Sequence, residues 1–372
     1  MKNKIWLSSP HMGGTEMNYV QEAYNTNWVA PLGPNVNGFE QDILKFTNAK
    51  ACAALSSGTA AIHLALILLG VEQDDEVLVS TFTFSATINP IIYQKAKPIF
   101  VDSEKETWNM CPVLLEKAIT DRIAKGIKPK AIVLVHLYGM PSKMDEIIFV
   151  ATKYNIPIIE DAAEALGSTY KGKAMGTHGE IGIYSFNGNK IITTSGGGAL
   201  VSNKTEHCAQ AVFLATQARD EAPHYQHSKI GFNYRMSNIL AGIGRGQMEV
   251  LNDRVATRRA NHAYYKDCLS SASLTFLNEP EGFFSNRWLT CVLTNSFSKR
   301  EKIREALALE NIEARPLWKP MHRQPIFKNF PSYLNGVSDA LFEKGLCLPS
   351  GSNLPKEDLN KVIKVIKRVV NA

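Results

Sequence analysis

The sequence predicts an α/β protein with a mostly parallel central sheet, helices on both faces, and a smaller α+β domain at the C-terminal end. Short segments that are apolar almost throughout are interpreted as strands: residues 76–80 (EVLVS), 97–102 (KPIFVD), 131–135 (AIVLV) and 156–160 (IPIIE). A helical pattern separates the last two, at residues 144–154. Strands of this kind are typical of parallel sheets buried between helices, which bind ligands at the carboxyl ends of their strands.

A chain of 372 residues is long enough for about two domains. We expect a large domain over residues 1–249, with an N-terminal arm over about 1–40, and a small domain over residues 250–372. A long helical stretch at residues 237–265 is interpreted as the bridge between them. The elements expected in the small domain are a strand near 288–293, a helix at 299–310 and a last helix from 356.

The N-terminal arm is expected to be irregular. It contains Pro10, the pair Gly13 and Gly14, and a turn around Leu32 that proline and glycine flank on both sides. A helical pattern begins only in residues 38–46, where apolar residues recur on one face. An arm of this kind either lies over a site or only connects two elements, and the residues leave both readings open.

Composition narrows the classes of function. The net charge of +6 is small and no dense basic run occurs, so we expect no nucleic-acid partner, whereas an anionic small molecule is compatible. No sustained apolar stretch opens the chain and no run of about 18 apolar residues occurs, which predicts a cytoplasmic protein without a membrane partner. The six cysteines form no CxxC pair and no histidine belongs to an HExxH motif, so we expect reduced thiols and no metal site.

Residues 51–69 predict a strand of small residues followed by an apolar helix, with Ser57, Gly58 and Thr59 between them. Hydroxyl groups, a glycine and free backbone N–H groups at the start of a helix are suited to bind a phosphate. The alternative is a simple helix cap. The segment is not a Walker loop, because no GK[ST] follows.

Residues 181–201 read IGIYSFNGNKIITTSGGGALV and place Lys190 between an apolar strand and three glycines. Lysine is rarely buried unless a partner or a reaction uses it. One such use is a desolvated amine that forms an imine with an aldehyde cofactor, and glycines let the backbone pass close to a ligand. The alternative is a surface lysine in a glycine-rich hairpin.

Two acids and an aromatic residue complete a candidate cofactor site. Asp161 closes the strand IPIIED, and a buried carboxylate needs a partner. The protonated ring nitrogen of pyridoxal phosphate would fit, since an ion pair there keeps the ring able to accept electrons. Glu164 could bind the ring hydroxyl and Phe84 could stack on the ring. A helix cap for Asp161 and plain core packing for Phe84 are the alternatives.

Other candidates carry weaker signals. Ser185 could bind the phosphate, whereas Asn233 and Arg235 precede the long helix, where polar residues are usually caps. The residues expected at or near carboxyl ends of strands are Ser57, Phe84, Asp161 and Lys190. No GxGxxG follows a strand and GxSxG is absent, and no helix-turn-helix pattern indicates a cofactor-binding regulator. A pyridoxal phosphate enzyme of another type, such as a lyase, stays open.

Together these segments resemble the DegT/StrS-type nucleotide-sugar aminotransferases, which have the fold-type I architecture of pyridoxal phosphate-dependent enzymes. The resemblance covers nearly the whole chain and rests on PLGPNVNGFE, SSGTAAIHLAL, TFTFSAT, VHLYGMPSKMD, IIEDAAEALG, the SF…K segment, GFNYRMSN and RPLWKPMH. It implies that Lys190 is joined to the cofactor and that Asn233 reaches the phosphate bound by a neighbouring subunit, so that the enzyme is a homodimer. The other implied cofactor residues are Asp161 at the ring nitrogen, Glu164 near the ring hydroxyl, Phe84 as the stacking ring, and Gly58, Thr59 and Ser185 at the phosphate.

The segment SFNGNK departs from many members of that family, which have a histidine where this chain has residues 187–189. With the SPHMGG opening and LWKPMH, it most resembles the bacterial transaminases that make UDP-4-amino-4,6-dideoxy-N-acetylglucosamine for bacillosamine-type sugars. The resemblance implies transfer of an amino group from L-glutamate to a UDP-linked 4-keto-6-deoxy sugar. A dTDP- or GDP-linked keto sugar, aminated at C3 or C4, is the alternative. A sister group that performs dehydration lacks the lysine, so Lys190 argues against that reaction.

The resemblance also implies which residues contact the sugar nucleotide. These residues are Asn27, Trp28, Ala30, Lys319, His322, Arg323 and Gln324. Lys319 and Arg323 would face the diphosphate, since cations recognise phosphate oxygens. For these two residues, solvated surface charge is the alternative.

Overall fold

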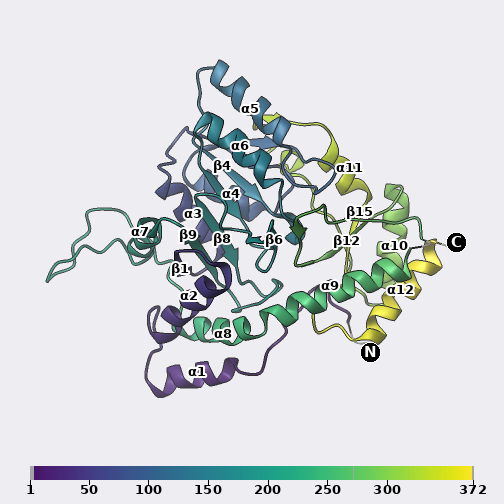
Figure 1. Cartoon of the computed structure of the whole chain (residues 1–372), viewed down its shortest axis with the longest axis horizontal. Helices are drawn as coiled ribbons and strands as arrows, with labels where there is room; N and C mark the ends of the chain where they lie inside the picture. The colour runs from purple at the N-terminus through teal and green to yellow at the C-terminus, as the bar shows by residue number, and fades with distance from the viewer. Residues whose placement is uncertain (1–3, 271, 371–372) are drawn as a thin grey trace.

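The computed structural model describes residues 4–270 and 272–370. An eight-stranded sheet forms the centre, in the order β1-β9-β8-β5-β4-β2-β3-β14 (Figure 1). The strands are β1 (Ala51–Leu55), β2 (Glu76–Ser80), β3 (Lys97–Val101), β4 (Ala131–Val135), β5 (Ile158–Asp161), β8 (Ile181–Ser185), β9 (Gly198–Ser202) and β14 (Ser332–Tyr333). The pairs from β14 to β8 are parallel, and β9 runs antiparallel to β8 and β1. The predicted α/β fold with a mostly parallel sheet is confirmed.

The strands form where the sequence is apolar almost throughout. β2 and β4 have the predicted bounds, and β3 ends one residue before the predicted end. β5 begins at Ile158 rather than at Ile156, because Pro157 has no N–H to donate to a neighbouring strand. Within β4, Ile132 and Leu134 belong to one hydrophobic cluster and Val133 to the other. This alternation shows that both faces of the sheet are covered.

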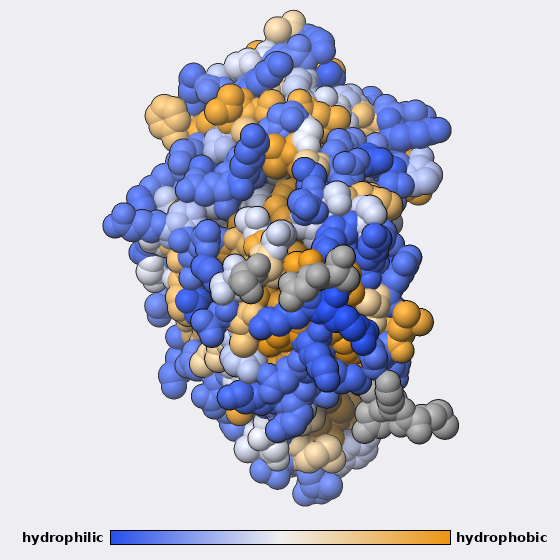
Figure 2. Space-filling view, turned by 90° about the vertical axis from the view of Figure 1, so that its right-hand side faces the viewer, coloured by the Kyte–Doolittle hydropathy of each residue, from blue (hydrophilic) through white to orange (hydrophobic). Residues whose placement is uncertain are grey.

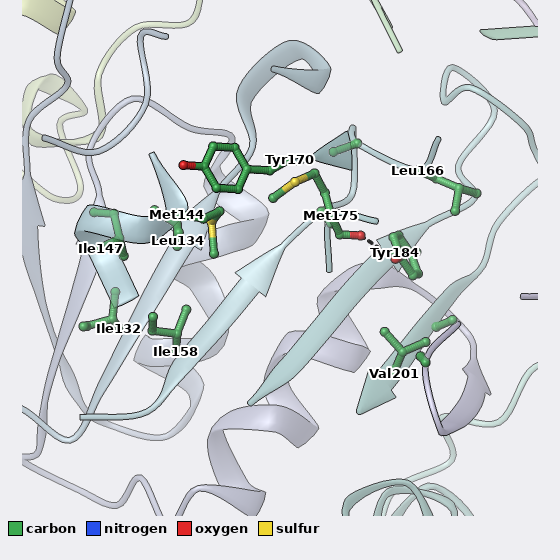
Figure 3. Packing of buried hydrophobic residues seen from close by; sticks show 14 of the residues in the cluster. Ile132, Leu134, Met144, Ile147, Ile158, Leu166, Tyr170, Met175, Tyr184 and Val201 are labelled. Atoms are coloured by element: carbon green, nitrogen blue, oxygen red, sulfur yellow. Dashed lines mark hydrogen bonds between the residues drawn. The ribbon is translucent and has the colours of Figure 1, made fainter. Parts of the chain in front are cut away.

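Helices cover the two faces. One cluster includes apolar residues of α2 (Pro34–Thr47), α5 (Pro112–Ala124), α6 (Met144–Tyr154) and α8 (Asn238–Glu249), and the other includes those of α3 (Gly58–Leu68), α4 (Ser85–Tyr93) and α7 (Thr205–Ala215). Figure 3 shows part of the first cluster, where Met144 and Ile147 of α6 lie beside the strand residues Ile132 and Leu134. α6 has the bounds that the sequence predicted.

Three predictions of helical structure differ from the structure. The N-terminal arm contains helix α1 (Glu16–Asn25), which lies along α8, and Glu16 accepts hydrogen bonds from the N–H groups of Gly13 and Gly14. α2 begins at Pro34 instead of residue 38, because proline suits the first position of a helix. The long stretch at 237–265 forms α8 and then α9 (Leu251–Cys268), which are separated at Val250.

The C-terminal part of the chain forms a second, antiparallel sheet in the order β10-β12-β15-β13. Its elements are β10 (Thr275–Phe276), β12 (Thr290–Leu293), β13 (Arg315–Pro316) and β15 (Gly345–Leu348), with α10 (Phe297–Leu309), α11 (Val337–Lys344) and α12 (Lys356–Val370). A third sheet joins β11 (Phe283–Phe284) to β6 (Thr169–Tyr170) and β7 (Lys173–Ala174). Since β14 and β11 pair with strands from the first half, a domain boundary near residue 250 stays a prediction.

The surface shown in Figure 2 mixes hydrophilic and hydrophobic side chains without one dominant apolar face. None of the described helices combines the length and the apolar character that crossing a bilayer requires. The pictured face therefore offers no extended apolar band.

Gly198 fixes the distance between β9 and the start of α3. A Cβ atom at this position would lie 2.3 Å from the carbonyl carbon of Ser57 and 2.4 Å from the nitrogen of Gly58, both of which are backbone atoms. We expect Gly198→Ala to lower the free energy of unfolding by about 1–3 kcal/mol in urea denaturation, because the backbone itself must shift. Gly196→Ala is the matched control, since a Cβ there meets no heavy atom within 4 Å. Equal stability of the two variants would contradict this packing argument.

Candidate active site

The predicted cofactor residues lie along one edge of the central sheet. Ser57 follows β1, Phe84 follows β2 at the start of α4, Asp161 ends β5 and Ser185 ends β8. These strands run in the same direction, so their carboxyl ends share that edge. Ser57, Phe84 and Asp161 thus lie at or near strand ends as predicted, and Lys190 follows the end of β8 by five residues.

The start of α3 and the end of β8 form the end of the site suited to a phosphate. The Ser57 hydroxyl accepts a hydrogen bond from the N–H of Ala60 at 3.0 Å, so Ser57 caps α3 as the alternative reading proposed. A Cβ atom on Gly58 would lie 3.1 Å from Cβ of Ser185, so Ser185 stands directly beside this helix start. Free N–H groups at the start of a helix favour an anion. The roles of Ser57, Gly58, Thr59 and Ser185 as phosphate ligands stay predictions.

Asp161 is a buried acid with little compensation from the protein. Its side chain accepts hydrogen bonds from the Thr87 hydroxyl at 2.7 Å and from the N–H of Ala163 at 3.2 Å. The Thr87 hydroxyl is itself 2.8 Å from that of Thr83. In residues 4–270 and 272–370 no lysine, arginine or histidine forms an ion pair with Asp161, although the residue is only 6 % exposed. A buried carboxylate without a protein cation suits a cationic group on a ligand.

Glu164 is buried beside the lysine. One carboxylate oxygen accepts a hydrogen bond from the N–H of Tyr138 at 2.6 Å, and the other lies 3.6 Å from Nζ of Lys190. Burial raises the pKa of Glu164 to about 7, although Lys190 and the Tyr138 N–H act in the opposite direction. Glu164 is therefore an acid that changes its charge near neutral pH.

Lys190 lies in a turn after β8, where its N–H donates to the carbonyl of Asn187 at 3.0 Å. Its side chain is 13 % exposed, so the reading as a surface lysine was wrong. The Nζ atom lies 4.5 Å from the centre of the Trp288 ring. The Trp288 indole N–H and the Ser8 hydroxyl both donate to the carbonyl of Asn189, at 2.7 and 2.8 Å. The amine is thus held between a carboxylate and an aromatic face.

Aromatic side chains form a wall of the site. Phe84 is 56 % exposed, so plain core packing was the wrong reading for it. Its ring centre lies 5.4 Å from that of Trp318, which lies 5.4 Å from that of Tyr138. The backbone N–H of Trp318 donates to the Tyr138 hydroxyl at 2.9 Å. An exposed ring at the site is available to stack on a flat ligand.

Asn233 is exposed and pairs through its backbone with Thr216. Its neighbour Tyr234 accepts a hydrogen bond from the Ser56 N–H at 2.7 Å, which ties this strand segment to the start of α3. Arg235 donates to Glu40 at 2.8 Å and to the Ala54 carbonyl at 3.0 Å. Arg235 therefore has a structural ion pair, and the role of Asn233 stays a prediction.

The first group of residues predicted to contact the sugar nucleotide, Asn27, Trp28 and Ala30, lies against the start of α8. The Asn238 side chain donates to the carbonyl of Trp28 at 3.0 Å, and its N–H donates to the carbonyl of Ala30 at 2.8 Å. Asn27 stands just before them with a φ of 57°. These contacts fix the segment against the helix that begins at Asn238. Its role toward a sugar nucleotide stays a prediction.

The second group lies between β13 and β14, where His322 contacts the loop that follows β2. The His322 Nδ1 atom is 2.8 Å from the Thr81 hydroxyl, and its Nε2 atom is 3.5 Å from Asp339. Arg323 pairs with Asp339 at 3.3 Å and is 41 % exposed, which fits the surface-charge alternative for this residue. The Gln324 side chain donates to the carbonyl of Lys319 at 3.3 Å. The segment lies near Phe84, because His322 contacts Thr81 and the neighbouring Trp318 contacts the Phe84 ring. Its contacts with substrate stay a prediction.

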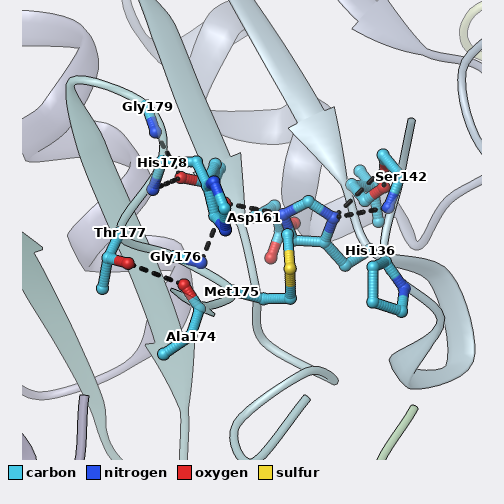
Figure 4. A network of polar contacts seen from close by, with 12 residues as sticks. His136, Ser142, Asp161, Ala174, Met175, Gly176, Thr177, His178 and Gly179 are labelled. Atoms are coloured by element: carbon cyan, nitrogen blue, oxygen red, sulfur yellow. Dashed lines mark hydrogen bonds and ion pairs between the residues drawn. The ribbon is translucent and has the colours of Figure 1, made fainter. Parts of the chain in front are cut away.

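A second buried network of polar contacts surrounds Glu160 of β5, next to Asp161 (Figure 4). The His136 Nε2 atom is 2.9 Å from Glu160, which also accepts from the N–H groups of Gly176, His178 and Gly179 at 2.8, 2.6 and 2.5 Å. Burial alone would raise the pKa of Glu160, but His136 and these N–H groups lower it below its ordinary value. Glu160 is thus a structural acid.

Several functional residues escaped the sequence analysis. Thr87 stands one helical turn after Phe84 in TFTFSAT, and this spacing was a usable signal. Tyr138, Trp288 and Trp318 lie far from Lys190 in the sequence, and no local pattern indicates that Trp288 lies against the amine while Tyr138 and Trp318 pack against Trp288. Only the tertiary fold brings them together.

The residues fit pyridoxal phosphate. Among the described residues the buried Asp161 forms no ion pair with a protein cation, and the Lys190 amine lies 3.6 Å from the neighbouring acid Glu164. Phe84 presents an exposed aromatic ring, and the start of α3 is suited to an anion. This combination defines the class of pyridoxal phosphate-dependent enzymes with a covalently bound cofactor.

Comparisons with known proteins identify the family. Residues 10–367 match the model of the DegT/DnrJ/EryC1/StrS aminotransferase family, and the chain belongs to this family. The chain is 52 % identical over 371 residues to EpsN of Bacillus subtilis (strain 168), whose name provisionally describes a pyridoxal phosphate-dependent aminotransferase; the match covers 98 % of this chain and 96 % of EpsN. It is 37 % identical to the GDP-perosamine synthase of Escherichia coli O157:H7, with 95 % of each chain covered.

Solved structures of sugar aminotransferases have the same fold as this chain. The sugar aminotransferase Spr1654 of Streptococcus pneumoniae, named provisionally as such, superposes in its PMP form with a TM-score of 0.92 at 26 % identity, covering 99 % of this chain and 98 % of the other. Its PLP form superposes with a TM-score of 0.91. The protein is a pyridoxal phosphate-dependent sugar aminotransferase with the fold-type I architecture.

The raised pKa of Glu164 predicts a pH dependence of stability in the cofactor-free protein. The pKa of this carboxyl group is 4.5 in an unfolded chain and about 7 in the folded protein. The folded state therefore binds this proton more tightly, and the stabilisation is lost as pH rises from 4.5 to 7. The amide of Glu164→Gln does not titrate in this range. The free energy of unfolding of the wild type should therefore fall by about 3 kcal/mol relative to that of the variant as pH rises over that window.

Urea denaturation at pH 4.5, 6 and 7.5 measures this difference at values chosen around the window in which Glu164 titrates. A difference between wild type and Glu164→Gln that stays constant with pH would show that Glu164 titrates in the folded protein as it does in the unfolded chain.

Proposed function

We propose that the enzyme moves an amino group from L-glutamate to a UDP-linked 4-keto-6-deoxy sugar, most specifically a UDP-2-acetamido-2,6-dideoxy-4-keto-hexose, and forms the UDP-4-amino sugar. The observation that carries the chemistry is the Lys190 amine, which lies 3.6 Å from Glu164 and near the unpaired acid Asp161 at one sheet edge. The choice of sugar rests on the SFNGNK and LWKPMH segments and the SPHMGG opening. This product would serve bacillosamine-type glycan synthesis.

The bound cofactor supplies an aldehyde carbon that takes up the amino group and a ring that withdraws electrons from the reacting carbon. Lys190, when its amine is free and neutral, moves a proton between the reacting carbons as a general base and acid. Asp161 would hold positive charge at the ring nitrogen, because no cation of the described residues pairs with its carboxylate. Phe84, whose ring packs against Trp318, presents an exposed aromatic face that would stack on the cofactor ring.

A GDP-linked sugar is the second candidate. Relatives named GDP-perosamine synthases, from Escherichia coli O157:H7, Caulobacter vibrioides and Vibrio cholerae, share 37, 34 and 30 % of their residues with this chain over nearly its whole length. Their names support a guanosine nucleotide, whereas the segments quoted above support a uridine nucleotide. A dTDP-linked sugar and amination at C3 belong to the same group of alternatives.

A panel of keto-sugar nucleotides tests the proposal. We expect mass spectrometry to detect the 4-amino product from the UDP-linked sugar, with 2-oxoglutarate formed in equal amount from glutamate. Lys190→Ala should form no product and lose the visible absorbance of the cofactor-bound lysine, whereas Lys153→Ala, an exposed lysine on α6, should keep both. Amination of the GDP-linked sugar alone would replace the uridine assignment, and turnover by Lys190→Ala at the wild-type rate would refute the role of the lysine.

We propose further that the enzyme is a cytoplasmic homodimer with shared active sites. The loop between α7 and α8 extends away from the body of the chain (Figure 1), and its residues Tyr225 and Ile230 are 80 and 87 % exposed. Exposed apolar residues on a projecting loop suit contact with a second subunit. A cytoplasmic location is supported by the six cysteines, none of which forms a disulfide in the described structure, although Sγ atoms of Cys291 and Cys347 lie 3.8 Å apart.

Asn233→Ala tests the shared site. Because Asn233 is proposed to donate a hydrogen bond to the phosphate in the neighbouring subunit, its loss should weaken cofactor binding by about tenfold while the mass in light scattering stays that of a dimer. Asn252→Ala, an exposed asparagine on α9, is the matched control. Unchanged cofactor binding in Asn233→Ala, or a monomer that retains the cofactor fully, would contradict the shared site.

A further inference from the structure

A cavity of about 470 Å³ lies between helix α9 and the chain segment that leads into β12. The residues that line it are Arg259, His262, Ala263, Lys266, Asn278, Glu279 and Arg287. Three of them, at positions 259, 262 and 266, share one face of α9, since they are spaced three, four and seven residues apart. None of these lining residues belongs to the cofactor site described above.

The cavity carries an excess of positive charge. Arg259, Lys266 and Arg287 are cations, and Glu279 is the one acid among the lining residues, so their formal charges sum to +2. Glu279 forms a bidentate pair with Arg259 and lies 3.6 Å from Arg287, whereas Lys266 donates only to Asn278, at 2.8 Å. Arg287 is 8 % exposed and has a φ of 53°. Arg287 donates to the carbonyl of Leu277 at 2.8 Å and shares Glu279 with Arg259, so a single carboxylate serves two guanidinium groups.

His262 is a buried, neutral histidine among these cations. The residue is 7 % exposed, and its Nδ1 atom is buried without a hydrogen-bond partner among the residues that the structure describes. Burial, followed by the charge of Arg287 and with smaller contributions from Lys266 and Arg259, lowers the pKa of His262 to about 3, so the ring is neutral. Buried polar atoms without partners are rare in folded proteins.

We propose that this cavity binds a phosphate group, either as inorganic phosphate or as the diphosphate of a nucleotide. Its donors come from two directions, the face of α9 on one side and the 278–287 segment on the other. A phosphate presents acceptor oxygens in all directions and carries the two negative charges that the cavity lacks. A planar carboxylate fits less well, because Glu279 already occupies the fork of Arg259.

Isothermal titration of the cofactor-loaded enzyme with inorganic phosphate tests the proposal without reference to catalysis. The wild type should bind phosphate saturably in the millimolar range or tighter. Lys266→Gln should weaken this binding by about tenfold, because one charge-assisted hydrogen bond is lost. Lys266 is exposed, so the variant should fold normally, and Lys364→Gln, an exposed lysine on α12, is the matched control that should bind like the wild type.

A competing titration with UDP distinguishes the two sources. Displacement of phosphate by UDP from the Lys266-dependent site would indicate a nucleotide, and phosphate binding that UDP leaves unchanged would indicate free phosphate; either result supports the site. The proposal is overturned if phosphate does not bind saturably, or if Lys266→Gln binds it as tightly as the wild type does. Neither result bears on the transamination, since the cavity shares no lining residue with the cofactor site.

Discussion

The burial of two carboxylates beside a single amine is the constraint on which the rest of the active site depends. Asp161 and Glu164 are 6 and 4 % exposed, and among the carboxylates of the described residues Lys190 pairs with Glu164, at 3.6 Å. Taking two acids out of water costs several kcal/mol unless cations or hydrogen bonds compensate. Burial raises the pKa of Glu164, which favours its neutral form. Asp161 would instead be compensated by the ring nitrogen of the cofactor. A site with this imbalance is complete only when the cofactor is bound.

The amine is positioned by residues from both halves of the chain. Trp288 lies under Lys190, and its carbonyl accepts from the buried Arg258 of α9, which also donates to Ser8. Asn286 donates to the carbonyl of Glu164 at 2.8 Å, so one short segment contacts both the acid and the base of the site. A shift of α9 would therefore move Trp288 against Lys190. This arrangement couples the C-terminal part of the chain to the chemistry more directly than a simple covering domain would.

The sequence predicted most of the central sheet, because strands that are apolar on both sides leave a local pattern. It also identified Lys190, Asp161, Glu164 and Phe84 as a group, since α/β sheets bind ligands where strands end. It failed at α1, where Glu16 accepts a hydrogen bond from Gln247 of α8, and at Trp288, which reaches Lys190 across about a hundred residues. Such residues are fixed by tertiary packing, and a single sequence carries no periodic signal for them.

Two neighbouring acids in β5 show how the fold separates structural from functional charge. Side chains alternate along a strand, so Glu160 and Asp161 leave the backbone on opposite faces of the sheet. Glu160 accepts hydrogen bonds from His136 and from three backbone N–H groups, which satisfy its charge within the protein. Asp161 accepts from only one hydroxyl and one N–H group. Both acids are buried, and it is the difference in their partners, rather than in their burial, that leaves Asp161 able to bind a cation from outside the chain.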